Sequence, residues 1–159
     1  MDYSSKFTIF TDGSALNNKA EAPAGMALYI PSRKLLMSKS MISTNNQAEL
    51  EAVRYALWYF TERFINLRIP DNTLYIFTDS EYSINAITGK WKNLKENLAK
   101  INVCRGLIRR IDEKGKKTVF IHVKAHTGKK DFVSLNNDIV DQEARRRAKE
   151  NTTADTANN

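Results

Sequence analysis

Four acidic residues stand where neighbouring elements of a folded domain could bring them together. Asp12 follows an apolar strand in the sequence FTDGS, and Asp79 follows another in FTDSEY. If those two strands are neighbours, the two carboxylates lie side by side. Glu49 and Asp141 are each predicted in the first turn of a helix. This spacing predicts a cluster of carboxylates at one end of the fold.

A carboxylate cluster is suited to binding hard cations. Close carboxylates repel one another, and burial raises the free-energy cost of keeping them ionised. Mg²⁺ offsets this cost because it prefers oxygen ligands, and it keeps positions for water and phosphate oxygens. Two such ions about 3.5–4 Å apart would bind the attacking and leaving oxygens of a phosphoryl displacement. The alternative for each residue is structural, since acidic side chains also cap turns and begin helices.

Two histidines receive different interpretations. His126 lies in the loop sequence KAHTG, where an imidazole could transfer protons or assist product release, or could be an ordinary surface residue. His122 lies within a predicted strand and is interpreted as structural.

The hydrophobic pattern predicts the elements that would position these residues. Thr44 and Gln47 fit the capping box of a helix whose apolar residues recur every three or four positions up to Phe64. Pro and Gly signals separate the other segments. Strands are predicted at 6–11, 24–30, 33–42, 74–78 and 118–123, and further helices at 82–87, 103–111 and 138–149.

This order predicts an α/β fold with a five-stranded mixed sheet flanked by helices. The first three strands are joined by short connections and should be antiparallel, whereas the last two are reached through helices and should be parallel. Residues 1–150 are expected to form one catalytic domain, and residues 151–159 a disordered tail.

Composition limits the function classes. The net charge of +7 favours polyanions such as nucleic acids, although solubility alone could explain it. Cys104 is the only cysteine, so no disulfide can form within the chain, which suits a reducing compartment. The sequence has neither a signal peptide nor an apolar stretch of about 20 residues. We expect a cytoplasmic monomer with no membrane association.

The acidic motifs resemble those of type 1 ribonuclease H. Each motif is short, but all five occur in the family's order from about Phe7 to Ala148. The resemblance is carried by Thr11–Ser14, Thr44–Leu50, Thr78–Tyr82, Val123–Gly128, and Asn137–Asp141 with Ala144.

The resemblance implies an endonuclease that hydrolyses the RNA strand of RNA–DNA hybrids. It implies two Mg²⁺ ions, with Mn²⁺ as a possible substitute, bound by Asp12, Glu49, Asp79 and Asp141. Water attack would leave 5′-phosphate and 3′-hydroxyl ends, and His126 would assist proton transfer or product departure. Asp138 is a rival for the fourth carboxylate, but the spacing from Asn137 favours Asp141.

The resemblance also implies contacts with the hybrid. Only the 2′-hydroxyl distinguishes RNA from DNA at a given site, and amide side chains can both donate and accept hydrogen bonds. Ribose contacts are assigned to Asn45 and Asn46, a DNA-strand phosphate to Thr44 and Asn102, and further contacts to Asn18 and Trp91.

Two features depart from the family pattern. Glu81 stands where glutamine is common, and the basic segment from Gly89 to Asn102 is short. Two other functions therefore stay open: a related nuclease that acts on DNA, and a hybrid-binding module without catalysis. The cationic run Arg145–Arg147 is interpreted as a solvated helix face, because consecutive helix positions point in different directions.

Overall fold

The computed structural model describes residues 1–17, 19, 21–92, 95–124 and 128–157, with side chains described up to Asn151. The strands are β1 (Phe7–Ala15), β2 (Ala22–Ile30), β3 (Leu35–Ser43), β4 (Thr73–Thr78) and β5 (Lys117–His122). The α-helices are α1 (Asn45–Arg63), α2 (Glu81–Ile87), α3 (Leu98–Glu113) and α4 (Phe132–Ala157), and short 3₁₀ turns lie at Tyr3–Ser5, Pro31–Arg33 and Pro70–Asn72.

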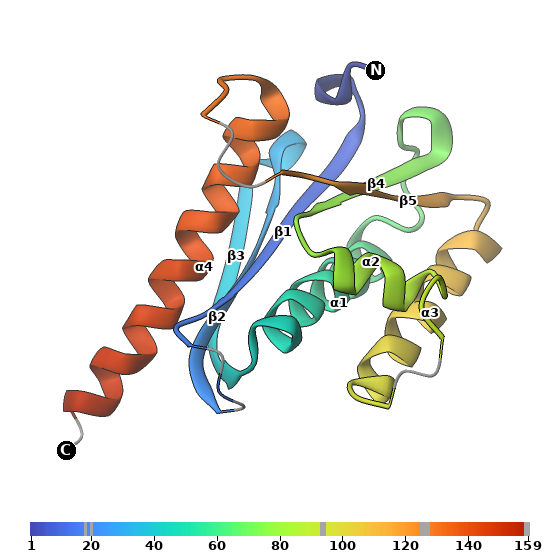
Figure 1. Cartoon of the computed structure of the whole chain (residues 1–159). Coiled ribbons are helices and arrows are strands. Elements are labelled where there is room, and N and C mark those ends of the chain that lie inside the picture. The colour runs from blue at the N-terminus through green and yellow to red at the C-terminus, as the bar shows by residue number, and fades with distance from the viewer. Residues whose placement is uncertain (18, 20, 93–94, 125–127, 158–159) are drawn as a thin grey trace.

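The sheet has the strand order β3-β2-β1-β4-β5. β1 pairs antiparallel with β2, and β2 with β3, whereas β1 and β4 are parallel, as are β4 and β5. The predicted five-stranded mixed sheet is confirmed. α4 covers one face of the sheet, and α1, α2 and α3 lie on the other side (Figure 1).

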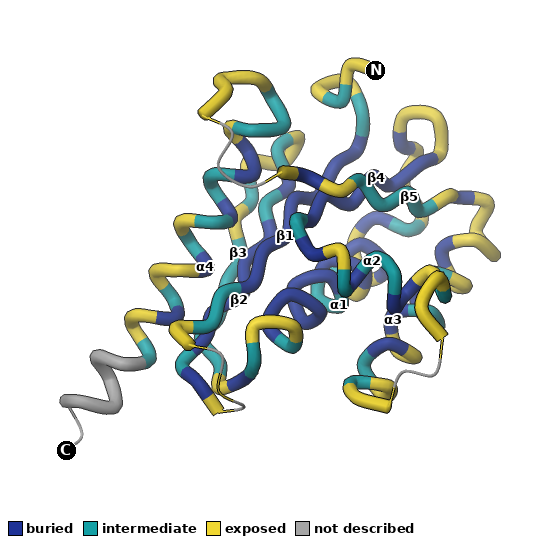
Figure 2. Tube along the Cα trace, in the orientation of Figure 1, coloured by how far each residue is buried: buried dark blue, intermediate teal, exposed yellow. Residues whose placement is uncertain are grey.

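Alternating side chains of the central strands build a core on each face. Ile9 packs in the core that α1 and α3 cover, whereas its neighbour Phe10 packs in the core under α4. Phe10 stacks on Phe77 of β4 with ring centroids 4.4 Å apart, which fastens the central strand pair. The central strands and the inner side of α1 are the most continuously buried parts of the chain (Figure 2). Cys104 of α3 lies fully inside the first core.

Several predicted element boundaries were wrong, three of them near the site. β1 continues beyond Asp12 to Ala15 because β2 keeps pairing with it, and Asp12 lies opposite Ala27. α4 begins at Phe132 rather than Asp138, because Asp131 Oδ1 accepts a hydrogen bond from Ser134 N (2.8 Å) at its start. α3 begins at Leu98, five residues before the predicted start.

The acidic residues Glu49 and Asp141 do not lie in the first turns of their helices, where they were predicted. Glu49 is the fifth residue of α1 and lies just beyond its first turn, and Asp141 lies in the third turn of α4. The predicted capping box at Thr44 is confirmed, since Thr44 and Gln47 exchange backbone and side-chain hydrogen bonds of 3.0 and 3.1 Å.

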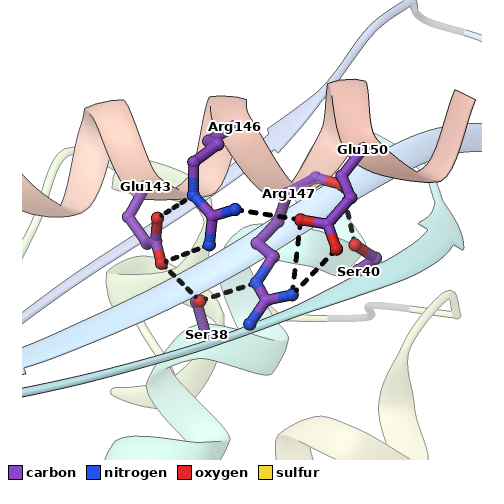
Figure 3. Close-up of polar contacts among 6 residues, drawn as sticks. All are labelled: Ser38, Ser40, Glu143, Arg146, Arg147 and Glu150. Atoms are coloured by element: carbon purple, nitrogen blue, oxygen red, sulfur yellow. Dashed lines mark hydrogen bonds and ion pairs between the residues drawn. The ribbon is translucent and has the colours of Figure 1, made fainter. Parts of the chain in front are cut away.

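The C-terminal half of α4 is fastened to the edge strand β3 (Figure 3). Arg147 Nε donates to Ser38 Oγ (2.9 Å), Ser40 Oγ donates to the Arg147 carbonyl (2.8 Å), and Ser38 Oγ donates to Glu143 (2.7 Å). Beyond residue 150 the helix continues to Ala157, and Asn151 Nδ2 donates to the Met41 carbonyl (3.0 Å). The first residue past 150 therefore takes part in the contact between α4 and β3. The division of the chain into a catalytic domain up to residue 150 and a disordered tail after it stays a prediction.

α4 approaches β2 most closely at a glycine. A Cβ atom on Gly25 would lie 2.2 Å from the Ala144 carbonyl oxygen and 2.7 Å from Arg147 Cβ. This separation is far below van der Waals contact, so the helix can pack here only because residue 25 has no side chain. No helix among the residues described is long and apolar enough to cross a membrane.

Candidate active site

Asp12, Glu49 and Asp79 converge from three elements. Each offers a carboxylate oxygen, and these three atoms all lie within 4.8 Å of one another. Asp12 and Glu49 are buried, with exposed fractions of 4% and 3%, whereas Asp79 is partly exposed at the end of β4. The cluster therefore opens to solvent on the Asp79 side, and the structure brings together three of the four predicted carboxylates.

A close approach between β1 and α1 positions the first two members. Gly13 N donates to Asp12 Oδ1 (3.0 Å) and also to the Glu49 carboxylate. A Cβ atom on Gly13 would lie 2.2 Å from both Ala48 C and Glu49 N, so only glycine allows this approach.

β4 is held in register beside β1 at the same end of the sheet. Thr11 Oγ1 donates to the Phe77 carbonyl (3.0 Å), which places Asp12 and Asp79 at adjacent strand positions. The ring of His122 lies 3.2 Å from the Asp79 carbonyl oxygen through Nε2, so it contacts the backbone and supports the structural interpretation of this histidine.

Asp141 approaches the cluster from α4 on the opposite face. Its Oδ1 accepts from Arg145 Nε (3.2 Å), and its side chain is 16% exposed. It is outside the group of three mutually close ligand atoms, yet its charge is among the causes that raise the pKa of Asp12. Asp141 thus borders the cluster and faces Asp12.

The carboxylates destabilise one another's charged forms. Burial, followed by the charges of Asp79 and Asp141, raises the pKa of Asp12 well above its usual value. Burial, followed by the charges of Asp12 and Asp79, raises the pKa of Glu49 in the same way. Buried oxygens with mutual repulsion and few hydrogen-bond donors fit a hard divalent cation, whose charge would reverse both shifts.

A polar groove of 590 Å³ lies beside the cluster at the start of α1. Its lining consists of Thr44, Asn45, Asn46, Gln47, Glu96 and Asn97. Asn97 is fixed between two neighbours, because its Oδ1 accepts from Gln47 Nε2 (3.3 Å) and its Nδ2 donates to the Tyr82 hydroxyl (3.0 Å).

Asn97 of this groove was not among the substrate contacts predicted from the sequence. Asn102, which was predicted to hold a DNA-strand phosphate together with Thr44, lies within α3 on its exposed side and does not line the groove. A usable signal was present: Asn97 is the residue before the helix, a position that favours asparagine, but the helix was predicted to begin five residues later.

The other predicted substrate contacts lie apart from the cluster or outside the described residues. Trp91 is 42% exposed and contacts the Tyr82 ring at a centroid distance of 6.1 Å, so it lies beside the residue that holds Asn97. His126 and Asn18 are outside the described residues, and their assignments stay predictions. Arg145 and Arg146 each pair with a carboxylate on α4 and are exposed, in accord with the predicted helix-surface role. The prediction was wrong for Arg147, which is partly buried because its guanidinium also donates to Ser38 of β3.

Comparison with known proteins gives consistent matches. The ribonuclease H family model matches residues 4–149. A ribonuclease H from Neorickettsia sennetsu is 31% identical over 156 residues, covering 90% of this chain and 93% of that protein. One from Tropheryma whipplei is 41% identical over 81 residues, but the match covers only 51% of this chain and 44% of that protein.

Solved structures share the fold at lower identity. The structure of LC11-RNase H1, isolated from compost, has a TM-score of 0.67 at 24% identity and covers 93% of this chain and 99% of that one. The same enzyme in complex with an RNA/DNA hybrid gives a TM-score of 0.68 at 23% identity, covering 92% of this chain and 99% of that one. Since the family model spans nearly the whole length and a relative above 30% identity is matched almost end to end, the chain belongs to the ribonuclease H family.

Proposed function

We propose that this protein is a metal-dependent endonuclease that hydrolyses the RNA strand of RNA–DNA hybrids. The observation that carries the proposal is the cluster of two buried carboxylates, Asp12 and Glu49, with the partly exposed Asp79, and with Asp141 beside it. Family membership supports the reaction class, and the relative solved with an RNA/DNA hybrid supports the substrate.

The four carboxylates would hold two divalent cations, Mg²⁺ or Mn²⁺. When bound, such ions supply Lewis-acid stabilisation to the attacking and leaving oxygens of phosphodiester hydrolysis, which leaves 5′-phosphate and 3′-hydroxyl ends. The protein holds the metal-binding carboxylates in fixed positions, because Asp12 lies in the central strand and Gly13 N donates to both the Asp12 and Glu49 carboxylates. His126 is proposed to transfer a proton to the departing product.

The groove beside the cluster would bind the hybrid on both strands. The Asn45 Oδ1 atom already accepts from Ala15 N (3.2 Å), which leaves its amide NH₂ group to donate to a ribose 2′-hydroxyl. Asn46 is exposed at the same helix start and can do likewise. Thr44 uses its hydroxyl oxygen as an acceptor in the capping box, so its O–H stays available for a DNA-strand phosphate, with Asn97 across the groove.

A gel cleavage assay tests this function. One labelled oligoribonucleotide is supplied free, paired with RNA and paired with DNA, each with Mg²⁺, with Mn²⁺ and with EDTA. We expect cutting of the hybrid alone, and only with metal. Cutting of DNA substrates would favour the related DNA nuclease, and tight hybrid binding without cutting would favour the binding module.

Substitutions assign the carboxylates within the same assay. Asp12→Asn and Asp141→Asn are expected to reduce cleavage by a factor of at least about 10³, whereas Asp138→Asn, the matched change three residues earlier on α4, should keep near-normal activity. A normal rate for Asp12→Asn, with folding verified by circular dichroism, would remove the basis of the site assignment.

A further inference from the structure

A second polar groove lies between α3 and β5, apart from the carboxylate cluster. Its volume is 360 Å³. Its lining includes Arg105, Arg109, Asp112, Lys116, Lys117 and Thr118. Four of these residues are basic and one is acidic, so the groove carries an excess of positive charge.

Two of the basic side chains are fixed by the protein itself. Arg105 donates to the carbonyls of Ala86 (2.7 Å) and Ile87 (3.1 Å) at the end of α2. Lys116 donates through Nζ to the Ile65 carbonyl (2.7 Å) and is almost fully buried. Both cations donate to neutral carbonyls, which hold the two positive charges at set positions in the groove wall.

The other two basic side chains have no such partners. Within the part of the chain that the structure describes, neither Arg109 nor Lys117 makes an ion pair or a side-chain hydrogen bond. Arg109 lies one helical turn after Arg105, on the same side of α3, and Lys117 begins the edge strand β5. A guanidinium and an ammonium group of this kind can together bind a tetrahedral oxyanion, the first through paired donors and the second as a point charge.

Thr118 adds an observation that points to a missing partner. Among buried side-chain nitrogen and oxygen atoms of the described residues, its Oγ1 alone has no hydrogen-bond partner. An unpaired buried hydroxyl destabilises a folded protein and is therefore uncommon. Because Thr118 lines the groove, a χ1 rotation that turns the hydroxyl towards an anion held there would satisfy it.

The groove is distant from the carboxylate cluster along the sheet. β5 runs parallel to β4, with Lys117 opposite Thr73 and His122 opposite Thr78, next to Asp79. Five residue steps therefore separate Lys117 from the catalytic edge, about 16 Å along the strand. An anion in this groove is not the phosphodiester that is cut.

We propose that the α3–β5 groove is a second anion site that binds a phosphate group through Arg109 and the Thr118 hydroxyl, with Lys117 reaching the groove around the edge of β5, because its side chain leaves the strand on the other face of the sheet from Thr118. The phosphate could be free in solution or belong to a single-stranded extension of a hybrid bound at the cluster. Asp112, the acidic residue of the lining, would repel any negatively charged part of a ligand that lies beside it. It therefore disfavours large anions relative to a single phosphate group.

Amide chemical shifts measured by NMR test the site directly. The protein is titrated with inorganic phosphate in EDTA at constant ionic strength, so that no metal draws phosphate to the carboxylates. We expect saturable shifts in the segment 116–119 and in the facing turn of α3. Arg109→Ala with Lys117→Ala should weaken this binding about tenfold or more, and Thr118→Val should weaken it without loss of stability.

A charge-matched variant distinguishes a specific phosphate site from the general electrostatic attraction of phosphate to a basic protein. Arg110→Ala with Lys114→Ala removes the same charge from exposed positions of α3 and the following turn that do not line the groove. This control should bind phosphate like the parent protein. Equal weakening in both double variants, or no saturable shift at all, would overturn the proposal.

The source of the phosphate is distinguished with two hybrids in EDTA. One is blunt, and the other carries a single-stranded extension of about ten nucleotides. If the extended hybrid shifts the groove amides and the blunt one does not, the ligand is a nucleic-acid phosphate. If neither hybrid shifts them while inorganic phosphate does, the groove binds a free anion, and the cleavage assay is unaffected in either case.

Discussion

The carboxyl groups of Asp12 and Glu49 make the metal-free protein sensitive to pH. Both have pKa values raised well above the usual range, chiefly by burial. The folded protein therefore holds these protons more tightly than the unfolded chain, whose carboxyl groups titrate near pH 4. Their stabilising contribution is full below about pH 4, and it is lost as pH rises through the raised folded-state pKa values.

Thermal unfolding in EDTA measures this contribution. The difference in Tm between Asp12→Asn and the parent protein should grow in favour of the variant as pH rises from about 5 to 8, because the variant has lost one repelling charge. Asp138→Asn serves as the control, with a difference that stays constant over the same range. A Tm difference for Asp12→Asn that does not change with pH would contradict the raised pKa values.

At the scale of residues, Asp12, Glu49 and Asp79 could be predicted as members of the cluster because acidic residues stood at predicted strand ends and at a predicted helix start. The details were wrong, since Asp12 lies within β1 and Asp141 in the third turn of α4. The cause is that strand length depends on the partner strand, and pairing with β2 carries β1 beyond its own apolar run. Asn97 was missed because a polar segment hid the start of α3.

At the scale of elements, Glu51 joins three parts of the fold around one carboxylate. It pairs with Arg54 on its own helix, with Lys39 of β3 (3.1 Å) and with Lys100 of α3 (3.5 Å). Burial alone would raise the pKa of Glu51, but these cations lower it below its usual value. Glu51 therefore helps to fix α3, and with it Asn97, against α1.

We expect Glu51→Gln to lower the free energy of unfolding by about 1–2 kcal/mol. The value is modest because the three cations stay partly hydrated when their counter-charge is removed. Urea denaturation measures the change, and 1 M salt should reduce it, since screening weakens the parent ion pairs. Glu113→Gln, at the exposed end of α3, should change stability by less than about 0.5 kcal/mol.

The contact of α4 with β2 depends on the absence of a side chain at residue 25. Gly25→Ala is expected to destabilise the protein by at least about 2 kcal/mol, because the added Cβ would overlap the Ala144 carbonyl. Gly106→Ala is the matched control, as a Cβ on this α3 residue meets no atom within 4 Å. It should stabilise the protein by about 0.5–1 kcal/mol through helix propensity. Similar unfolding midpoints for the two variants would refute the close approach.

The element order and strand directions could be predicted because each depends on local pattern and connection length. Short turns between the first three strands require antiparallel pairing, and helices before β4 and β5 allow parallel pairing. The start of α4 could not be predicted in this way. Its first residues mix polar and apolar side chains without a clear period, so the pattern does not mark Asp131 as the residue that accepts a hydrogen bond at the helix start.

At the scale of the whole molecule, the charge of +7 should make hybrid binding strongly dependent on salt. Lys90, Lys92 and Lys95 are exposed in the segment that joins α2 to Asn97. Replacing all three by alanine should reduce the slope of log affinity against log salt by up to about 3, one for each phosphate that a lysine no longer neutralises. Fluorescence anisotropy in EDTA measures the slope, and Arg110→Ala with Lys114→Ala should leave it nearly unchanged.

The buried position of Cys104 has a practical consequence for studying motion. Burial raises the pKa of its thiol to about 12, so almost no thiolate forms at neutral pH and thiol-directed labels have no reactive group to attack. Since Cys104 is the only cysteine of the chain, labels will attach only to cysteines that are introduced on the surface. Pairs of spin labels or fluorophores can thus be placed on the native background, and α3 can be followed relative to α1 while a hybrid is bound.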